Sequence, residues 1–114
     1  MCCDYSVERM LRLERMAATK IMTAVSAVVP EDREAEFLDG YRVLNETSKP
    51  DGLLRTELLR RRDGGFVIQT VWRDRDALMA ARDPNTPPPA LALLDKVGAS
   101  HSHDVLTIEQ EYAT

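Results

Sequence analysis

The spacing of apolar residues along the chain predicts four β-strands. Residues 21–29 (IMTAVSAVV) are nearly all apolar or small, as expected of a central strand that is covered on both faces. Residues 66–72 (FVIQTVW) are rich in β-branched and aromatic side chains, which pack well on a pleated surface. Polar and apolar residues alternate along residues 53–61 and 105–112, and we interpret both segments as strands.

Helical spacing appears in the segments between these strands. One face of the first predicted helix, which begins at Pro30, carries four large side chains: Phe37, Leu38, Tyr41 and Leu44. Asp74 directly follows the 66–72 strand and offers a carboxylate that can cap the first N–H groups of a second helix. A shorter helical piece over residues 90–97 ends at Gly98.

The predicted order of elements is β-α-β-β-α-β. This order is typical of an α+β, ferredoxin-like fold, in which a four-stranded antiparallel sheet carries helices on one face. The other face also needs cover, and we expect it to present four valines: Val25, Val67, Val71 and Val105. A second copy of the same sheet would cover this face most simply, which predicts a homodimer.

The sequence divides into one domain and a short extension. We assign residues 20–114 to the ferredoxin-like domain, because a chain of 114 residues has enough material for a single core. Residues 1–19 form an N-terminal extension. Apolar residues recur there at near-helical spacing over residues 6–18, which predicts either a short amphipathic helix or a frayed leader.

Composition narrows the environment and the partners. The net charge of −4 argues against a nucleic-acid-binding surface, because such surfaces are basic. The only cysteines, Cys2 and Cys3, are adjacent and too few for a disulfide framework or a zinc site, which favours a cytoplasmic location. No apolar run approaches the roughly 20 residues that span a bilayer, so we expect no membrane partner.

Residues 52–84 carry a resemblance to a known family. Its marks are Gly52 at the start of one strand, Val71–Trp72 at the end of the next, and Ala77–Leu78 in the following helix. With these marks the chain resembles the antibiotic biosynthesis monooxygenases over about residues 20–114. The resemblance implies a small dimeric α+β barrel. Better-understood members oxidise polycyclic aromatic polyketides with molecular oxygen and no cofactor, and a related branch degrades haem.

The resemblance also implies roles for single residues. Trp72 stands at the family's strand-end tryptophan. Ile68 and Ser26 occupy the places where members with quinone-forming activity tend to carry asparagines, and Leu78 occupies the place of a tyrosine that one member uses. The haem-degrading branch needs a tryptophan at the position of Ala81, which disfavours haem as a substrate.

A candidate site follows from the resemblance and the strand pattern. We expect two catalytic residues, Trp72 and Ser26, and five substrate-binding residues, Ile68, Thr70, Tyr41, Leu38 and Leu78. By the two-residue period of strands, Ser26 should share the helix-facing side of the sheet with Trp72, as should Ile68 and Thr70. Structural alternatives exist, because an indole often fills a core and hydroxyls often bond neighbouring backbone groups.

His101 and His103 are the only histidines in the chain. In an extended segment they point the same way, so they could offer two nitrogens to a metal or one general base. A surface junction between a loop and a strand also explains them. We predict neither a metal nor a cofactor.

Two functions remain open from the sequence. The first is a cofactor-independent monooxygenase that oxidises a small aromatic or polyketide-like molecule with O2 in a pocket between sheet and helices. The second is a dimeric barrel that binds a small ligand or has a structural role without turnover. The asparagines that active members carry are absent here, which favours the second function, whereas hydroxyls and an indole around one pocket are compatible with the first.

Overall fold

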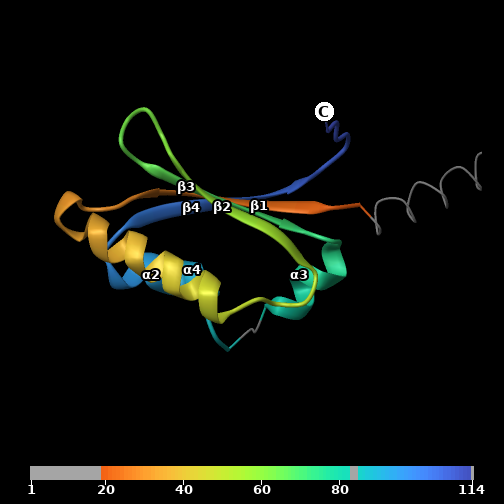
Figure 1. The fold of residues 1–114 in the computed structure, drawn as a ribbon, viewed down its shortest axis with the longest axis horizontal. Helices are drawn as coiled ribbons and strands as arrows, with labels where there is room; N and C mark the ends of the chain where they lie inside the picture. The colour runs from red at the N-terminus through yellow and green to blue at the C-terminus, as the bar shows by residue number, and fades with distance from the viewer. Residues whose placement is uncertain (1–18, 83–84, 114) are drawn as a thin grey trace, which may run out of the picture.

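The computed structural model describes residues 19–82 and 85–113 (Figure 1). In chain order the elements are β1 (Ile21–Val28), η1 (Glu31–Arg33), α2 (Glu34–Thr47), β2 (Leu53–Arg60), β3 (Phe66–Trp72), α3 (Arg75–Ala81), α4 (Pro89–Lys96) and β4 (Ser100–Thr107). The helix predicted over residues 6–18 lies outside the described residues. No helix among the described residues is long and apolar enough to cross a membrane.

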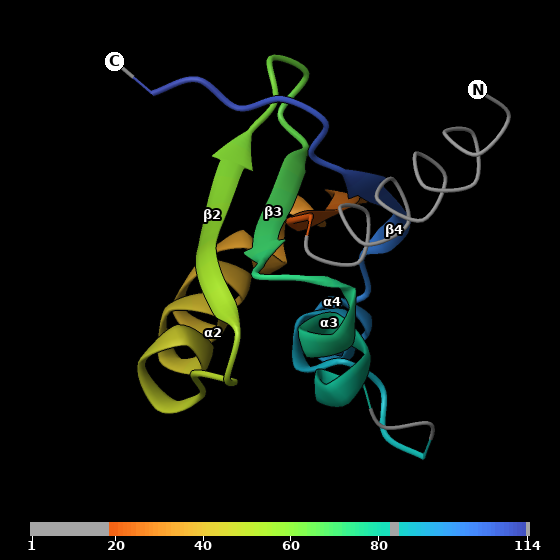
Figure 2. The same cartoon turned by 90° about the vertical axis from the view of Figure 1, so that its right-hand side faces the viewer.

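The four strands form one antiparallel sheet in the order β2-β3-β1-β4. All of the helices lie on one face of this sheet (Figures 1 and 2). In Figure 2, α2 lies beneath β2, and α3 and α4 lie to the right of α2 on the same face. This arrangement confirms the ferredoxin-like fold that the order of elements predicts. The opposite face carries no helix of the described chain.

The core lies between the sheet and the helices. Phe37 of α2 and Leu94 of α4 are fully buried, as is Val97 just after α4. Phe66 of β3 packs against Phe37 with ring centroids 5.2 Å apart, and the Arg60 guanidinium lies 4.5 Å from the centroid of the Phe66 ring. This cluster therefore fills the end of the sheet that α2 and α4 cover.

Local signals in the sequence explain how α3 starts. The carboxylate of Asp74 accepts a hydrogen bond from the backbone N–H of Ala77 at 2.8 Å, which confirms the predicted cap. Because β3 ends at Trp72, the cap turns the chain into the helix only two residues beyond the indole. Ala77 and Leu78 are thereby packed against Trp72.

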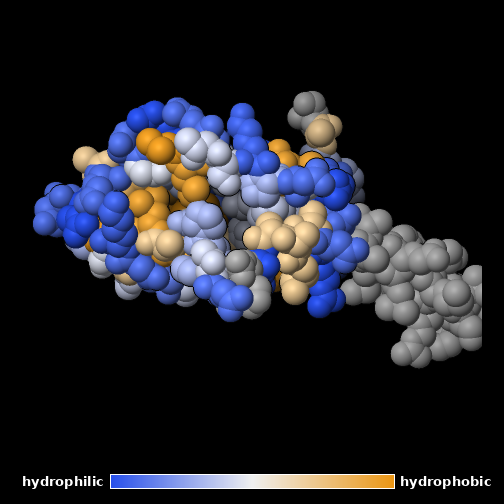
Figure 3. All heavy atoms as spheres, turned by 90° about the horizontal axis from the view of Figure 1, so that it is seen from below, coloured by the Kyte–Doolittle hydropathy of each residue, from blue (hydrophilic) through white to orange (hydrophobic). Residues whose placement is uncertain are grey.

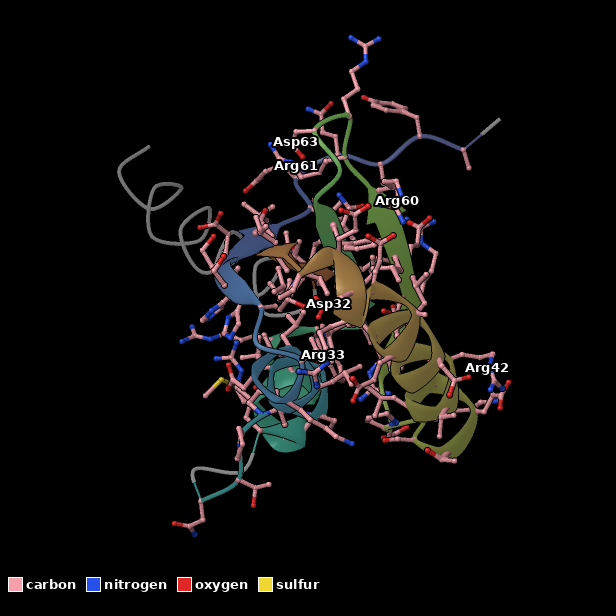
Figure 4. All side chains as sticks on the ribbon, turned by 90° about the vertical axis from the view of Figure 1, so that its left-hand side faces the viewer. Asp32, Arg33, Arg42, Arg60, Arg61 and Asp63 are labelled. Carbon is pink, nitrogen blue, oxygen red and sulfur yellow. The ribbon has the colours of Figure 1, made fainter. Side chains whose placement is uncertain are left out.

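Charged side chains cluster on the outside of the domain (Figure 4). On α2, hydrogen bonds from Arg42 to Asp39 at 2.7 Å and to Glu46 at 3.1 Å raise the pKa of Arg42. At the tip of the β2–β3 hairpin, the backbone N–H of Gly65 donates to Asp63 at 2.9 Å and lowers the pKa of that carboxyl. None of these groups lines the cleft described below.

The last strand differs from its prediction. Residues 105–112 were expected to form it, but β4 runs from Ser100 to Thr107 and pairs with the whole length of β1, from Val28 down to Ile21. Because β1 begins at Ile21, the chain beyond residue 108 has no strand to pair with. β4 is an exposed edge strand, so its first residues, SHSHD, can be polar on both faces. The sequence therefore shows no apolar alternation there to mark a strand.

Two of the four valines expected on the helix-free face of the sheet lie instead on the face that the helices cover. Val25 pairs with Ile68 and is buried under the helices, and Val105 lies in the same helix-facing set two residues beyond His103. Val67 and Val71 do face away from the helices, because they alternate with Ile68 along β3.

Gly52 allows the β2–α3 contact to close. It has φ +84°, and a Cβ placed on it would lie 2.4 Å from the Cβ of Ala77. Its carbonyl also accepts a hydrogen bond from the backbone N–H of Arg73 at 2.8 Å. Gly64 has a similar φ of +93°, but nothing lies within 4 Å of its added Cβ. A side chain at Gly52 would therefore meet both backbone strain and steric crowding, whereas one at Gly64 would meet backbone strain alone.

We predict that Gly52→Ala lowers the free energy of unfolding by about 2–5 kcal/mol, because it combines left-handed strain with overpacking. Gly64→Ala should cost only about 1–2 kcal/mol, from the backbone alone. Urea unfolding followed by circular dichroism measures both. Equal losses in the two variants would contradict the account of the Gly52–Ala77 contact.

Candidate functional site

A cleft of about 790 Å³ lies between the sheet and the helices. Its walls come from all four strands, from α2 and α3, and from the start of α4. Seen from the helix side, the surface is hollowed between the α2 end of the molecule and the α3 end, and hydrophobic residues border the hollow (Figure 3). The cleft is open to solvent on this side. Its size falls within the range of about 300–1,000 Å³ that is usual for small-molecule sites.

The sheet wall of the cleft is built of three rows of side chains that cross β1, β3 and β2. The register gives Val25, Ile68 and Leu58 in the first row, Thr23, Thr70 and Thr56 in the second, and Ile21, Trp72 and Leu53 in the third. A row of hydroxyl groups thus lies between two apolar rows, of which one contains the indole. Seven of these nine residues line the cleft: Val25 and Ile68 of the first row, Thr23, Thr70 and Thr56 of the second, and Trp72 and Leu53 of the third.

Trp72 holds the end of the cleft next to α3. Its side chain is 8% exposed and packs against Ile21, Ala77 and Leu78. The indole Nε1 is buried and has no hydrogen-bond partner among the described residues. A buried donor without an acceptor costs about 1–3 kcal/mol, so the native packing around this indole carries an unsatisfied group.

The hydroxyl row continues onto α2. Tyr41 Oη lies 2.6 Å from Thr56 Oγ1, and Thr56 Oγ1 lies 3.1 Å from Thr70 Oγ1. All three groups are partly buried and all three residues line the cleft. Asn45, one turn after Tyr41, also lines the cleft and donates its Nδ2–H to the Tyr41 carbonyl at 2.8 Å.

An irregularity in β2 places Thr56 in this row. The register slips between Leu53 and Arg55, so that Leu53 pairs with Trp72 while Arg55 pairs with Val71. The extra residue reverses the alternation of β2 at this point, which is the usual effect of a β-bulge. From the bulge onward Thr56 and Leu58 face the helices, and Leu54 is left about half exposed, at 51%.

Five of the seven predicted site residues line the cleft: Trp72, Ile68, Thr70, Tyr41 and Leu78. The expected position of Ser26 was wrong. Ser26 pairs with Val67 and therefore faces away from the helices, on the opposite side of the sheet from Trp72. Because residues 21–29 are nearly all apolar or small, no clear alternation in the sequence marks which side chains of this strand face inward.

The position of Leu38 was also wrong. It is 40% exposed and does not line the cleft. Phe37 and Tyr41 lie one turn apart on the face of α2 that meets the sheet, and Leu38 is turned about 100° away from Phe37. The apolar face of this helix is therefore one residue narrower than its sequence suggests.

Sequence reasoning missed several polar residues of the cleft, among them Thr23, Asn45 and Thr56. The alternation of β1 would have revealed Thr23 once Val25 was assigned inward. Thr56 depends on the bulge, for which the sequence carries no turn residue or glycine as a signal. Asn45 lies four residues after Tyr41, on the same side of the helix.

The two histidines have different surroundings. His101 Nε2 lies 2.8 Å from Asp95 Oδ1, an exposed contact that ties β4 to α4. His103 lines the cleft from β4. Among the described residues no group of three or more His, Cys, Asp or Glu side chains is placed to hold a metal ion.

The sequence profile of the family described as antibiotic biosynthesis monooxygenase matches residues 21–85. The chain belongs to this family. The match spans β1 to α3 and thus includes Trp72 and the whole hydroxyl row. No curated protein sequence matches the chain significantly.

Solved structures share the fold of this chain. A mutant of SnoaB from Streptomyces nogalater, described as a cofactor-independent oxygenase, is 28% identical, with 82% of this chain and 97% of that chain covered and a TM-score of 0.65. Rv0793 from Mycobacterium tuberculosis is 20% identical, with 82% and 99% covered and a TM-score of 0.56. A conserved protein from Methanosarcina mazei Go1 shares the fold at 13% identity, with 82% and 96% covered and a TM-score of 0.62.

Proposed function

We propose that this protein is a cofactor-independent monooxygenase that oxidises a small aromatic or polyketide-like molecule with O2 in the cleft. The observation that carries the proposal is the cleft itself: the space beside Trp72 is open and lined by hydroxyl groups rather than filled by leucines. Membership of the monooxygenase family and the likeness to SnoaB, described as a cofactor-independent oxygenase, support it.

The chemistry fits a site without a redox cofactor. An anthrone loses a proton from its CH2 group to solvent and gives an electron-rich anion. The anion reacts with O2 and forms a C–O bond, and the peroxide anion then takes up a proton. The resulting hydroperoxide loses water, and the carbon becomes the second carbonyl of a quinone. O2 is the oxidant, and one of its oxygen atoms leaves as water. The protein needs to exclude solvent, orient the ring and stabilise the anion.

The residues of the cleft match these tasks by type. Ile68 and Leu78 offer apolar surface to a flat ring, and Trp72 offers an aromatic edge or face. The hydroxyls of Tyr41 and Thr70 offer hydrogen bonds to a ring oxygen. We retain Trp72 as the candidate catalytic residue, and Ser26 has no part in this proposal because it faces the other side of the sheet.

A specific observation favours a second candidate function. Ile68, in the apolar row of the cleft wall next to the threonine row, is 3% exposed and supplies no polar group where the family resemblance implies an asparagine. A cleft that is apolar at this position can hold a small aromatic ligand without helping to remove its proton. The second candidate is therefore a ligand-binding barrel without turnover.

We further propose that the protein acts as a homodimer through the face of the sheet without helices. Apolar side chains on or beside this face are substantially exposed in the single chain, among them Leu59 at 38% and Leu106 at 48%. Met22 and Val67 lie on the same face and are partly exposed, whereas Val71 beside them is buried, at 6%. A second copy of this surface is its natural partner, because self-complementary faces give closed twofold dimers.

The enzyme proposal predicts that the protein accelerates quinone formation from an anthrone under O2. We expect Trp72→Phe to lower kcat/KM at least about tenfold, because one lost transition-state contact is worth about 1.4 kcal/mol or more. Tyr112→Phe, at an 86% exposed aromatic residue, is the control and should leave the rate unchanged. Quinone absorbance measures the rate, and a wild-type rate equal to the uncatalysed background would favour the binding barrel.

The dimer proposal predicts opposite results for two neighbouring positions of β4. Leu106→Glu places a charge on the helix-free face and should convert the dimer to monomers at micromolar concentration, because burying an unpaired charge is costly. Val105→Glu is the matched control, since Val105 is 49% exposed but faces the other way. Light scattering after size-exclusion chromatography measures the mass. A monomeric wild type, or monomers only for Val105→Glu, would contradict the proposal.

A further inference from the structure

We propose that Tyr41, Thr56 and Thr70 form a directed hydroxyl chain that binds the anionic oxygen of an ionised phenol or enol. The inference rests on the proposed function for the aromatic nature of the ligand, and it adds the group that recognises the ligand's oxygen. In this assignment Thr70 touches the ligand, whereas Thr56 and Tyr41 are positioning residues that act through Thr70.

The geometry brings three hydroxyls from three elements into a line. Tyr41 comes from α2, Thr56 from β2 and Thr70 from β3. The contacts of 2.6 Å and 3.1 Å between successive oxygens form a continuous path. Neither contact joins residues close in sequence, since 15 and 14 positions separate the partners. The chain therefore exists only in the folded sheet, and it depends on the bulge that turns Thr56 inward.

Counting protons shows why this chain has a donor to spare. Each hydroxyl carries one proton and can also accept. The two contacts between the three oxygens use two of the three protons, so one O–H is left over whichever way the bonds run. No other hydrogen bond of these three side chains is found among the described residues. Because all three residues line the cleft, the spare O–H is available to a ligand.

The direction of the chain follows from the acidity of its members. A phenol is far more acidic than an alcohol, so Tyr41 is the stronger donor and the short 2.6 Å contact fits donation from Tyr41 Oη to Thr56 Oγ1. A hydroxyl that accepts a hydrogen bond becomes a better donor, so we assign the Thr56 proton to the contact with Thr70 and the free proton to Thr70. Thr70 lies two residues before Trp72 on the same strand face, so this free O–H is presented beside the indole.

An anionic acceptor suits such a chain better than a neutral one. Hydrogen bonds to charged acceptors are about twice as strong as neutral ones, and bonds that run in one direction polarise and strengthen one another. No carboxylate side chain lines the cleft to repel an anion, and Arg82 is its one lining residue with a fixed positive charge, within the part of the chain that the structure describes. The hydroxyl chain of Tyr41, Thr56 and Thr70 therefore favours an oxygen anion on an aromatic ring.

The test compares two dyes that differ only at this oxygen. 2-Hydroxyanthraquinone ionises because its ring carbonyl is conjugated with the hydroxyl, whereas 2-methoxyanthraquinone does not ionise, and neither reacts with O2. Isothermal titration calorimetry above the pKa of the hydroxyl gives both dissociation constants. We expect the wild type to prefer the ionised dye by roughly 10- to 100-fold, the range of a hydrogen bond to a charged group.

Variants of Thr56 then separate the chain from the shape of the cleft. Thr56→Val keeps the volume but breaks the chain. Thr70 keeps its O–H but loses the partner that orients and polarises it, so we expect the preference to fall about two- to fivefold while the methoxy dye binds as before. Thr56→Ser restores the hydroxyl and should retain most of the preference. If Thr56→Val does not fold, as judged by circular dichroism, Tyr41→Phe removes the first donor of the chain and should also weaken the preference.

The outcomes distinguish this inference from the proposed function. Binding of both dyes without preference, or an undiminished preference in Thr56→Val or Tyr41→Phe, would overturn the hydroxyl chain but leave an aromatic-binding cleft. Absence of binding for both dyes would overturn the chain and the proposed function together. A preference that depends on Thr56, in a protein that does not turn over anthrone, would support the chain and assign the protein as a binding barrel.

Discussion

The antiparallel pairing of β1 with β3, the two central strands of the sheet, is the constraint on which the rest of the structure depends. Because strand side chains alternate, the pairing of Thr23 with Thr70 decides at once which residues of both strands face the helices. A slip of one residue would turn Trp72 and Ile68 to the helix-free face. The cleft, its indole and its hydroxyl row thus share one cause.

The bulge in β2 adds the third strand to this arrangement. It brings Thr56 level with Thr70 and within reach of Tyr41, so that the polar row reaches from the sheet to α2. Apolar rows on both sides keep this row away from the bulk of the solvent, which strengthens its hydrogen bonds. The same wall therefore offers an apolar surface to a ring and a polar line to its oxygen.

Much of the fold could be predicted from the sequence, because local rules determine it. Residues 66–72 form a strand as their β-branched and aromatic composition indicates, and Asp74 caps α3 as its position predicts. The site was less predictable. Ser26 lies in a strand without alternation and Thr56 follows a bulge without a sequence signal, so pairing in three dimensions, and not local preference, decides where both side chains point.

The central claim is that Trp72 and the threonine row form one wall that a ligand touches. Intermolecular nuclear Overhauser effects between 2-hydroxyanthraquinone and the labelled protein test it most directly, since the chain has a single tryptophan. We predict contacts from the ring protons of the dye to the Trp72 indole and to the methyl groups of Thr70 and Thr23. Contacts to Val67 or Leu106 instead, on the helix-free face, would contradict the account.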